Sequence, residues 1–260
     1  MNYEQDLEAL IQAVGRPCSL ALTTPLRERP PLGGSRLLGG SARMLPWEDW
    51  PRSEGEPMTC ILQVRIDELP FVPEILEPSA WLAMYADVNG DYMSEAGWEI
   101  REYPSLEGLV ERKAPALQER AAPWRPLHIT WRPYQDILSP SSGATALLGP
   151  QWAPVWDALP WYRRHQRPRL HRLDPLKYGR RGDLLPYSYH APRTKIGGFP
   201  TLKQHEFENG PSHPAHFLLQ IFHDVDFGQP SGQRYDLCDC AITYIGIDDE
   251  GEWRVDTQTS

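Results

Sequence analysis

The chain has few cysteines and no long hydrophobic run. Its 260 residues include only four cysteines, too few for a disulfide-stapled fold, so a reducing compartment is expected. No apolar run approaches the roughly 20 residues that a membrane-spanning helix needs. The acidic residues 1–4 lack the basic and apolar pattern of a signal peptide. These absences predict a cytoplasmic protein that does not use a membrane.

The motifs of the common enzyme classes are also missing. There is no Walker loop, no Gly-x-Gly-x-x-Gly fingerprint and no Gly-x-Ser-x-Gly elbow. Cys238 and Cys240 are separated by one residue, whereas zinc half-sites typically separate their cysteines by about two to four. We interpret both as buried strand residues. The sequence therefore predicts no catalytic residue, no metal ligand and no cofactor.

Proline and tryptophan, by contrast, are abundant, with 27 and 10 residues respectively. Because proline breaks helix interiors, many short segments and few long helices are expected. The clearest helix is predicted near the N-terminus and ends at Gly15, since four apolar residues there share one helical face. These residues are Leu7, Leu10, Ile11 and Val14.

Strands are predicted near both ends of the chain. Residues 58–66 alternate as a half-buried strand does, and residues 80–87, 217–222 and 241–247 are further strand-like runs. A turn at 248–251 would let 253–255 pair back as a hairpin. The middle, about 106–189, is rich in tryptophan and proline and is expected to be irregular, with a mobile loop at 139–143.

The net charge of −9 is unevenly distributed. Residues 163–181 hold eight basic side chains and one acid, while residues 206–260 hold eleven acids and two arginines. We call residues 163–181 the basic stripe, and we interpret its arginines as pairing with the acidic tail or stacking on tryptophans. A nucleic-acid partner is not expected, because such proteins normally carry a basic balance.

A short pattern occurs twice in the chain. A Gly-Gly pair is followed 22 or 23 residues later by a glutamine inside an apolar run. Paired glycines allow positive φ or close backbone approach, and a buried glutamine needs partners for both its oxygen and its amide nitrogen. The pattern predicts one structural unit used twice. Its residues are Gly39, Gly40 and Gln63, then Gly197, Gly198 and Gln220.

With the residues around them, these units resemble the YwqG-like family of unknown function. The matching motifs are Gly39-Gly40, Leu45-Pro46, Trp50-Pro51, Leu62-Gln63-Val64, Lys195-Ile196-Gly197-Gly198-Phe199-Pro200 and Leu218-Leu219-Gln220-Ile221. The resemblance implies an α+β fold, mainly antiparallel β built from two related halves, with the N-terminal amphipathic helix and the Pro/Trp-rich middle added. It implies a single domain over 1–260, with repeat units at about 32–87 and 190–248. It implies no reaction or cofactor.

Some members of that family occur in toxin–antitoxin gene clusters, which implies an immunity role. Our first hypothesis is therefore a non-catalytic bacterial immunity protein that neutralises a cognate secreted toxin, such as a nuclease, through an acidic surface. The predicted partner-binding residues are Glu206, Glu208, Asp224, Asp226, Asp248, Asp249 and Glu250. The oligomeric state is not predicted.

Two other functions stay open at this point. One is a metal-dependent hydrolase, or another enzyme, that uses histidines and aspartates near the second repeat. The other is a structural adaptor. Stoichiometric metal in the purified protein would favour the first of these over the immunity hypothesis.

Overall fold

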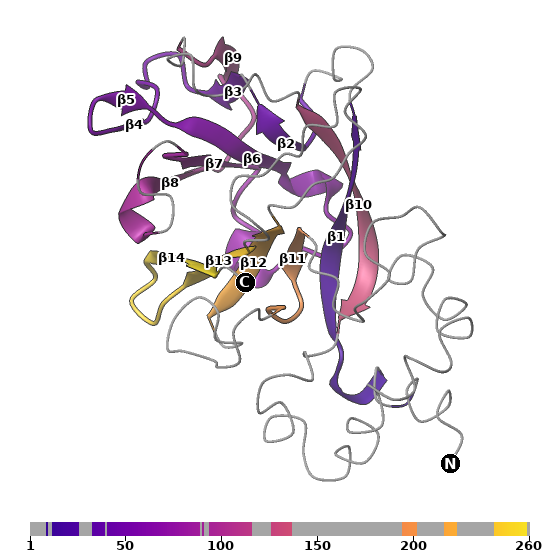
Figure 1. Ribbon diagram of the computed structural model, residues 1–260. Coiled ribbons are helices and arrows are strands. Elements are labelled where there is room, and N and C mark those ends of the chain that lie inside the picture. Colours follow the sequence, from indigo (N-terminus) through magenta and orange to yellow (C-terminus); the bar gives the residue numbers. More distant parts are fainter. Residues whose placement is uncertain are drawn as a thin grey trace.

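A computed structural model describes residue 9 and residues 12–25, 33–39, 41–88, 90, 94–115, 126–136, 194–201, 216–222 and 242–258. Its main feature is one ten-stranded antiparallel sheet with the order β14-β13-β12-β11-β1-β10-β2-β6-β7-β8 (Figure 1). The strands of this sheet are β1 (Arg16–Pro25), β2 (Arg36–Gly39), β6 (Thr59–Arg65), β7 (Trp81–Ala86), β8 (Trp98–Tyr103), β10 (Leu127–Asp136), β11 (Lys195–Gly197), β12 (Phe217–Phe222), β13 (Ile242–Ile247) and β14 (Trp253–Gln258).

Two small ribbons and three short helical turns complete the described residues. The ribbons pair β3 (Ser41–Met44) with β9 (Val110–Lys113), and β4 (Arg52–Ser53) with β5 (Glu56–Pro57). The turns are the 3-10 helices η1 (Ile66–Glu68), η2 (Glu74–Leu76) and η3 (Glu95–Gly97).

The predicted α+β class with an amphipathic helix is wrong. Nearly all regular structure in the described residues is antiparallel β, and besides the few helical residues near the N-terminus it holds only 3-10 turns of three residues each. Of the predicted N-terminal helix, the structure describes residue 9 and residues 12–14, which are helical, while Leu7, Leu10 and Ile11 lie outside the described residues. The many prolines disfavour long helices, because proline is excluded from helix interiors.

The centre of the sheet is the long pair β1–β10, which is aligned from Arg16↔Asp136 to Pro25↔Leu127. Each strand of this pair has a second neighbour: β1 also pairs with β11, and β10 also pairs with β2. In chain order the strands form two sets of five, namely β1-β2-β6-β7-β8 and β10-β11-β12-β13-β14. The first strand of each set is therefore hydrogen-bonded to the second strand of the other set.

The two sets match in detail beyond their strand order. Gln63 of β6 pairs with Arg36 of β2, and Gln220 of β12 pairs with Lys195 of β11. Toward the next strand, Gln63 pairs with Ala83 and Gln220 pairs with Tyr244. Each ladder also shifts register just before its glutamine, between Cys60 and Leu62 and between Phe217 and Leu219. Positions in one set can therefore be compared directly with positions in the other.

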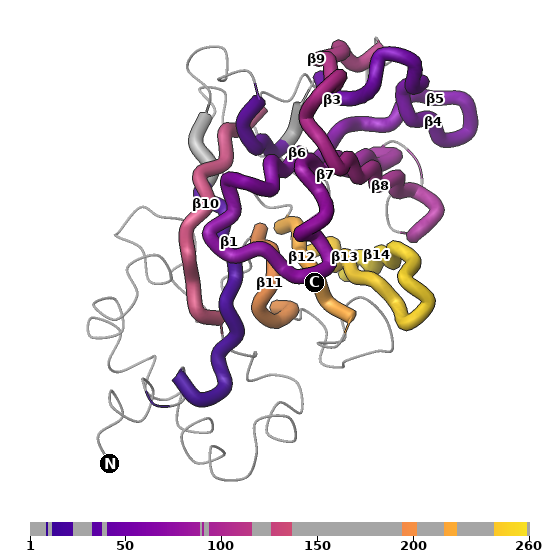
Figure 2. Tube along the Cα trace, turned by 180° about the vertical axis from the view of Figure 1, so that it is seen from behind, coloured from indigo at the N-terminus to yellow at the C-terminus, as the bar shows by residue number. Residues whose placement is uncertain are grey.

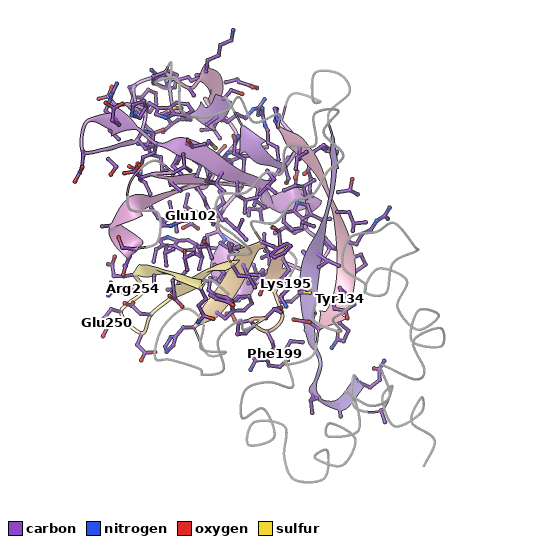
Figure 3. All side chains as sticks on the ribbon, viewed as in Figure 1. Glu102, Tyr134, Lys195, Phe199, Glu250 and Arg254 are labelled. Atoms are coloured by element: carbon purple, nitrogen blue, oxygen red, sulfur yellow. The ribbon has the colours of Figure 1, made fainter. Side chains whose placement is uncertain are left out.

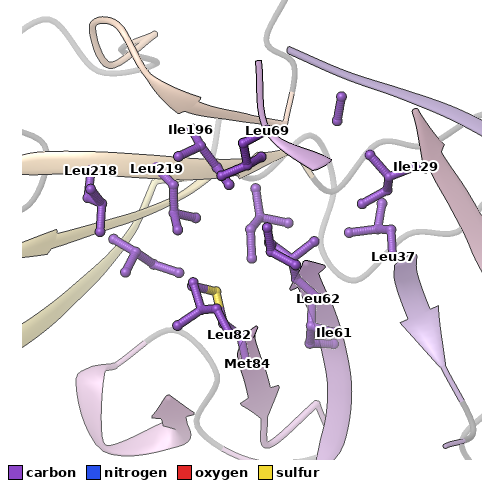
Figure 4. Close-up of a cluster of buried hydrophobic side chains, with 14 of the residues drawn as sticks. Leu37, Ile61, Leu62, Leu69, Leu82, Met84, Ile129, Ile196, Leu218 and Leu219 are labelled. Atoms are coloured by element: carbon purple, nitrogen blue, oxygen red, sulfur yellow. The ribbon is translucent and has the colours of Figure 1, made fainter. Parts of the chain in front are cut away.

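One hydrophobic core lies between the two sets. In both views the strands β6–β8 and β12–β14 extend to the same side of the β1–β10 pair (Figures 1 and 2). The buried cluster between them combines Leu37, Ile61, Leu62 and Leu82 of the first set with Ile196, Leu218 and Leu219 of the second (Figure 4). At the outer ends of the sets, Arg254 Nη1 lies 3.0 Å from Glu95 Oε1. Burial of this shared apolar surface holds the two sets together.

A second core covers the outer face of β6 and β7. It contains Met44, Trp50, Trp81, Tyr85 and Leu109, so the ribbons β3–β9 and β4–β5 pack over the sheet there (Figure 1). We call residues 41–57 and 106–113 the outer lobe. Because the lobe covers that face, the prediction of a half-buried strand at 58–66 is wrong: residues 59–64 of β6 are all buried.

The described part of the middle segment is regular, contrary to expectation, since it forms β9 and β10. The predicted loop at 139–143 and the basic stripe at 163–181 lie outside the described residues. No helix in the described residues is long and apolar enough to cross a membrane.

Candidate functional site

Each set holds one buried cation beside its glutamine. In the first set, Arg36 is 3% exposed and its guanidinium donates to both carboxylate oxygens of Glu111, at 3.0 and 3.2 Å, and to Ser41 Oγ at 3.3 Å. In the second set, Lys195 Nζ donates to Asp136 Oδ2 at 2.6 Å and to Thr201 Oγ1 at 3.1 Å (Figure 3). A buried charge must be paired to be tolerated, and both cations meet that requirement.

The two glutamines make equivalent contacts. Gln63 Oε1 accepts the backbone N–H of Arg43 at 2.9 Å, and Gln220 Oε1 accepts that of Thr201 at 2.9 Å. Gln63 Nε2 donates to the Ser41 carbonyl, and Gln220 Nε2 donates to Thr201 Oγ1. Each amide therefore fastens the segment that follows its Gly-Gly pair onto the outer face of the sheet.

Outer-face donors of the first set lack acceptors within the described part of the chain. Among these atoms are Arg36 Nε, Arg43 Nε and Trp81 Nε1, together with Tyr85 Oη and Arg101 Nη1. Trp81 is fully buried, and the Arg43 guanidinium carbon lies 5.8 Å from the centre of its ring. The hydrogen bonds from Arg36 and then Ser41, followed by the charges of Arg36 and Arg43, hold the pKa of Glu111 below its usual value. Two guanidinium groups thus face one carboxylate.

A cluster of phenol, thiol and guanidinium groups lies beside these donors. Tyr103 Oη donates to Glu48 Oε2 at 2.8 Å, and Arg101 lies over the ring of Tyr85. Burial raises the pKa of Cys60 to about 12 and also raises the pKa of Tyr85 and Tyr103. These groups are protonated at neutral pH, and of them Tyr103 donates to Glu48, while Tyr85 Oη has no partner among the described residues.

The structure places only part of the predicted partner-binding surface. Asp248, Asp249 and Glu250 lie at the turn between β13 and β14, next to Arg254 (Figure 3). Asp248 is engaged in the turn: it accepts the backbone N–H of Glu252 and the Arg254 guanidinium, which lower its pKa. Asp249 is 90% exposed. Glu206, Glu208, Asp224 and Asp226 lie outside the described residues.

The predicted structural residues are placed more completely. Gly39 lies in β2, and Gly197 and Gly198 both have φ of +78° at the end of β11, while Gly40 is outside the described residues. Cys238 and Cys240 are likewise outside them. In the described ranges no three His, Cys, Asp or Glu side chains gather as metal ligands would.

Sequence reasoning missed an exposed tryptophan on the outer lobe. Trp47 is 77% exposed and stands three residues after the end of β3 at Met44. The strand partner of Met44 is Val110, which is 41% exposed. We call Trp47 and Val110 the Trp47 patch. The exposed acids of the lobe are Asp49, Glu54, Glu56, Glu107 and Glu111. A tryptophan set between Pro46 and the acids Glu48 and Asp49 is the sequence feature that could have indicated this turn.

No family model matches the chain, and a comparison with curated proteins finds no match. The YwqG-like resemblance therefore remains a prediction from the motifs.

Proposed function

We propose that this chain acts by binding a basic partner protein through the Trp47 patch, without catalysis. The observation that carries the proposal is the 77% exposure of Trp47 on the outer lobe, where Val110 is also 41% exposed. Tryptophan is among the residues that most often dominate protein–protein binding energies.

The charge of the lobe favours a basic partner. Among the exposed side chains of the outer lobe, five acids outnumber the two bases Arg52 and Lys113, and the whole chain carries a net charge of −9. Such a surface steers a positively charged protein toward an apolar contact. A toxin neutralised in the cytoplasm is the partner we propose, in line with the immunity role that the family resemblance implies.

Affinity capture from the native host tests this proposal. The wild-type chain should retain a basic polypeptide in near-stoichiometric amount, and Trp47→Ala should weaken its binding by about 30-fold, as expected for a contact worth about 2 kcal/mol. Ile75→Ala is the matched control, because Ile75 is 51% exposed on η2 outside the outer lobe. Equal affinity of the purified partner for wild type and Trp47→Ala would refute the proposal.

A further inference from the structure

At three corresponding positions the first set carries buried donors without acceptors and the second set does not, although Trp131 Nε1 of β10 in the second set also has no acceptor among the described residues. Arg36 corresponds to Lys195, because each pairs with its set's glutamine. Arg43 corresponds to Thr201, because each donates its backbone N–H to that glutamine. Trp81 corresponds to Ile242, since each stands two residues before the glutamine's partner on the next strand.

At these three positions the second set is satisfied. Lys195 Nζ has both Asp136 and Thr201 as acceptors, Thr201 Oγ1 is hydrogen-bonded, and Ile242 has no polar side-chain atom. At the same positions the first set presents Arg36 Nε, Arg43 Nε and Trp81 Nε1, for which the described residues supply no acceptor. Arg36 is 3% exposed and Trp81 is 0% exposed, so bulk water does not readily replace the missing acceptors. A buried donor without an acceptor costs roughly 1–3 kcal/mol.

The charges around these three donors indicate the charge of a group that could accept hydrogen bonds from them. Glu111 accepts hydrogen bonds from the Arg36 guanidinium at both of its oxygens, and from Ser41 Oγ at Oε1. Arg43 has no carboxylate within 4.0 Å among the described residues, although its charge still lowers the pKa of Glu111. One guanidinium is therefore in excess, and Arg43 is only half-buried, so it can be reached from solvent.

We propose that the outer face of the first set is a binding site for the oxyanion of a small molecule, a carboxylate or a phosphate group. Its negative charge would balance Arg43, and its oxygens would accept from Arg43 Nε and Trp81 Nε1. Guanidinium groups recognise carboxylate and phosphate oxygens with short, charge-assisted hydrogen bonds. This proposal does not depend on the proposed partner.

The indole N–H of Trp81 offers a direct measurement. The chain contains ten tryptophans, and the Trp81 signal in a ¹⁵N–¹H spectrum of the full-length chain is the one lost in Trp81→Phe. Sodium acetate and sodium phosphate are titrated separately, with sodium chloride at matched ionic strength as the third arm. We expect a saturable shift of the Trp81 signal with acetate or phosphate and not with chloride. The tighter of the two identifies the oxyanion.

Two variants separate this site from general charge effects. Arg43→Gln should raise the oxyanion Kd by at least about tenfold, while Lys113→Gln, which removes one exposed charge from the same lobe, should leave it unchanged. A Trp81 signal that stays still, follows chloride equally, or shifts alike in Arg43→Gln overturns the proposal, and ordered water is then the acceptor. If Trp81→Phe does not fold, calorimetric titration of wild type and Arg43→Gln decides between the same outcomes.

Discussion

Lys195 Nζ lies 2.6 Å from Asp136 Oδ2, and each side chain is only 6% exposed. The two residues belong to β11 and β10, which are separated in the sheet by β1. The same carboxylate oxygen accepts the backbone N–H of Phe199 at 3.0 Å. One buried acid thus fixes the Gly197-Gly198 turn of the second set to the central strand pair.

Removing that acid should be costly. Asp136→Ala leaves a buried ammonium without its carboxylate, so we expect the free energy of unfolding in urea to fall by roughly 3–5 kcal/mol. Glu95→Gln is the control, because the Glu95–Arg254 pair is about half exposed and should matter little. A loss below about 1 kcal/mol for Asp136→Ala would show that the pair is not needed for stability.

Gly198 should tolerate no side chain. Its φ is +78°, and a Cβ there would lie 2.7 Å from Asp136 Oδ2. Gly55 has φ of +88° but open space around it. Gly55→Ala should therefore cost only the backbone strain, about 1 kcal/mol. Gly198→Ala should cost at least about 1 kcal/mol more, because the carboxylate must move. Equal midpoints in urea for the two variants would contradict this.

Most outer strands of the two sets could be predicted from the sequence, although β8 was not. Their apolar runs give β6, β7, β12 and β13 within a residue or two of the expected bounds, and β14 begins where the hairpin was expected. The two strands at the centre of the sheet were missed, because Pro17 and Pro133 lie within them. At Pro133, β10 has β1 as its one strand neighbour among the described residues, and proline is tolerated in such edge-like positions.

The candidate sites depend on contacts that no local pattern contains. The glutamines and glycines could be found because they recur at a fixed spacing. Glu111 reaches Arg36 across 75 residues, and Asp136 reaches Lys195 across 59, so neither partner could be assigned from sequence. The exposure of Trp47 likewise depends on how the outer lobe packs. Long-range packing, not composition, decides these features.

Glu111 should contribute to stability at mildly acidic pH. Arg36 holds its folded-state pKa below the ordinary value of 4.5, so the contribution is complete above that value and is lost as pH falls through the lower, folded pKa. We expect the urea midpoint of the wild type to decline over this range more steeply than that of Glu111→Gln. Parallel declines would show that Glu111 does not titrate with folding. Glu107→Gln, an exposed change of the same kind, controls for net charge.

The three acids at the β13–β14 turn should separate into two roles. Asp248 accepts backbone N–H groups from Glu250 and Glu252 and pairs with Arg254, so Asp248→Ala should lower the urea midpoint. Asp249 and Glu250 are exposed, so their joint reversal to lysine should leave the midpoint unchanged.

The two exposed acids should matter for partner binding although they do not matter for stability, if the acidic surface guides the encounter. The Asp249→Lys, Glu250→Lys variant should then slow association with a basic partner at low salt, and the difference should shrink as salt screens the charges. The turn lies well apart from the outer lobe in both views of the molecule (Figures 1 and 2). Dissociation, which depends on the apolar contact at Trp47, should therefore change little. An association rate equal to that of wild type at every salt concentration would show that Asp249 and Glu250 do not contribute to partner binding. The Trp47 patch would then remain as the proposed contact.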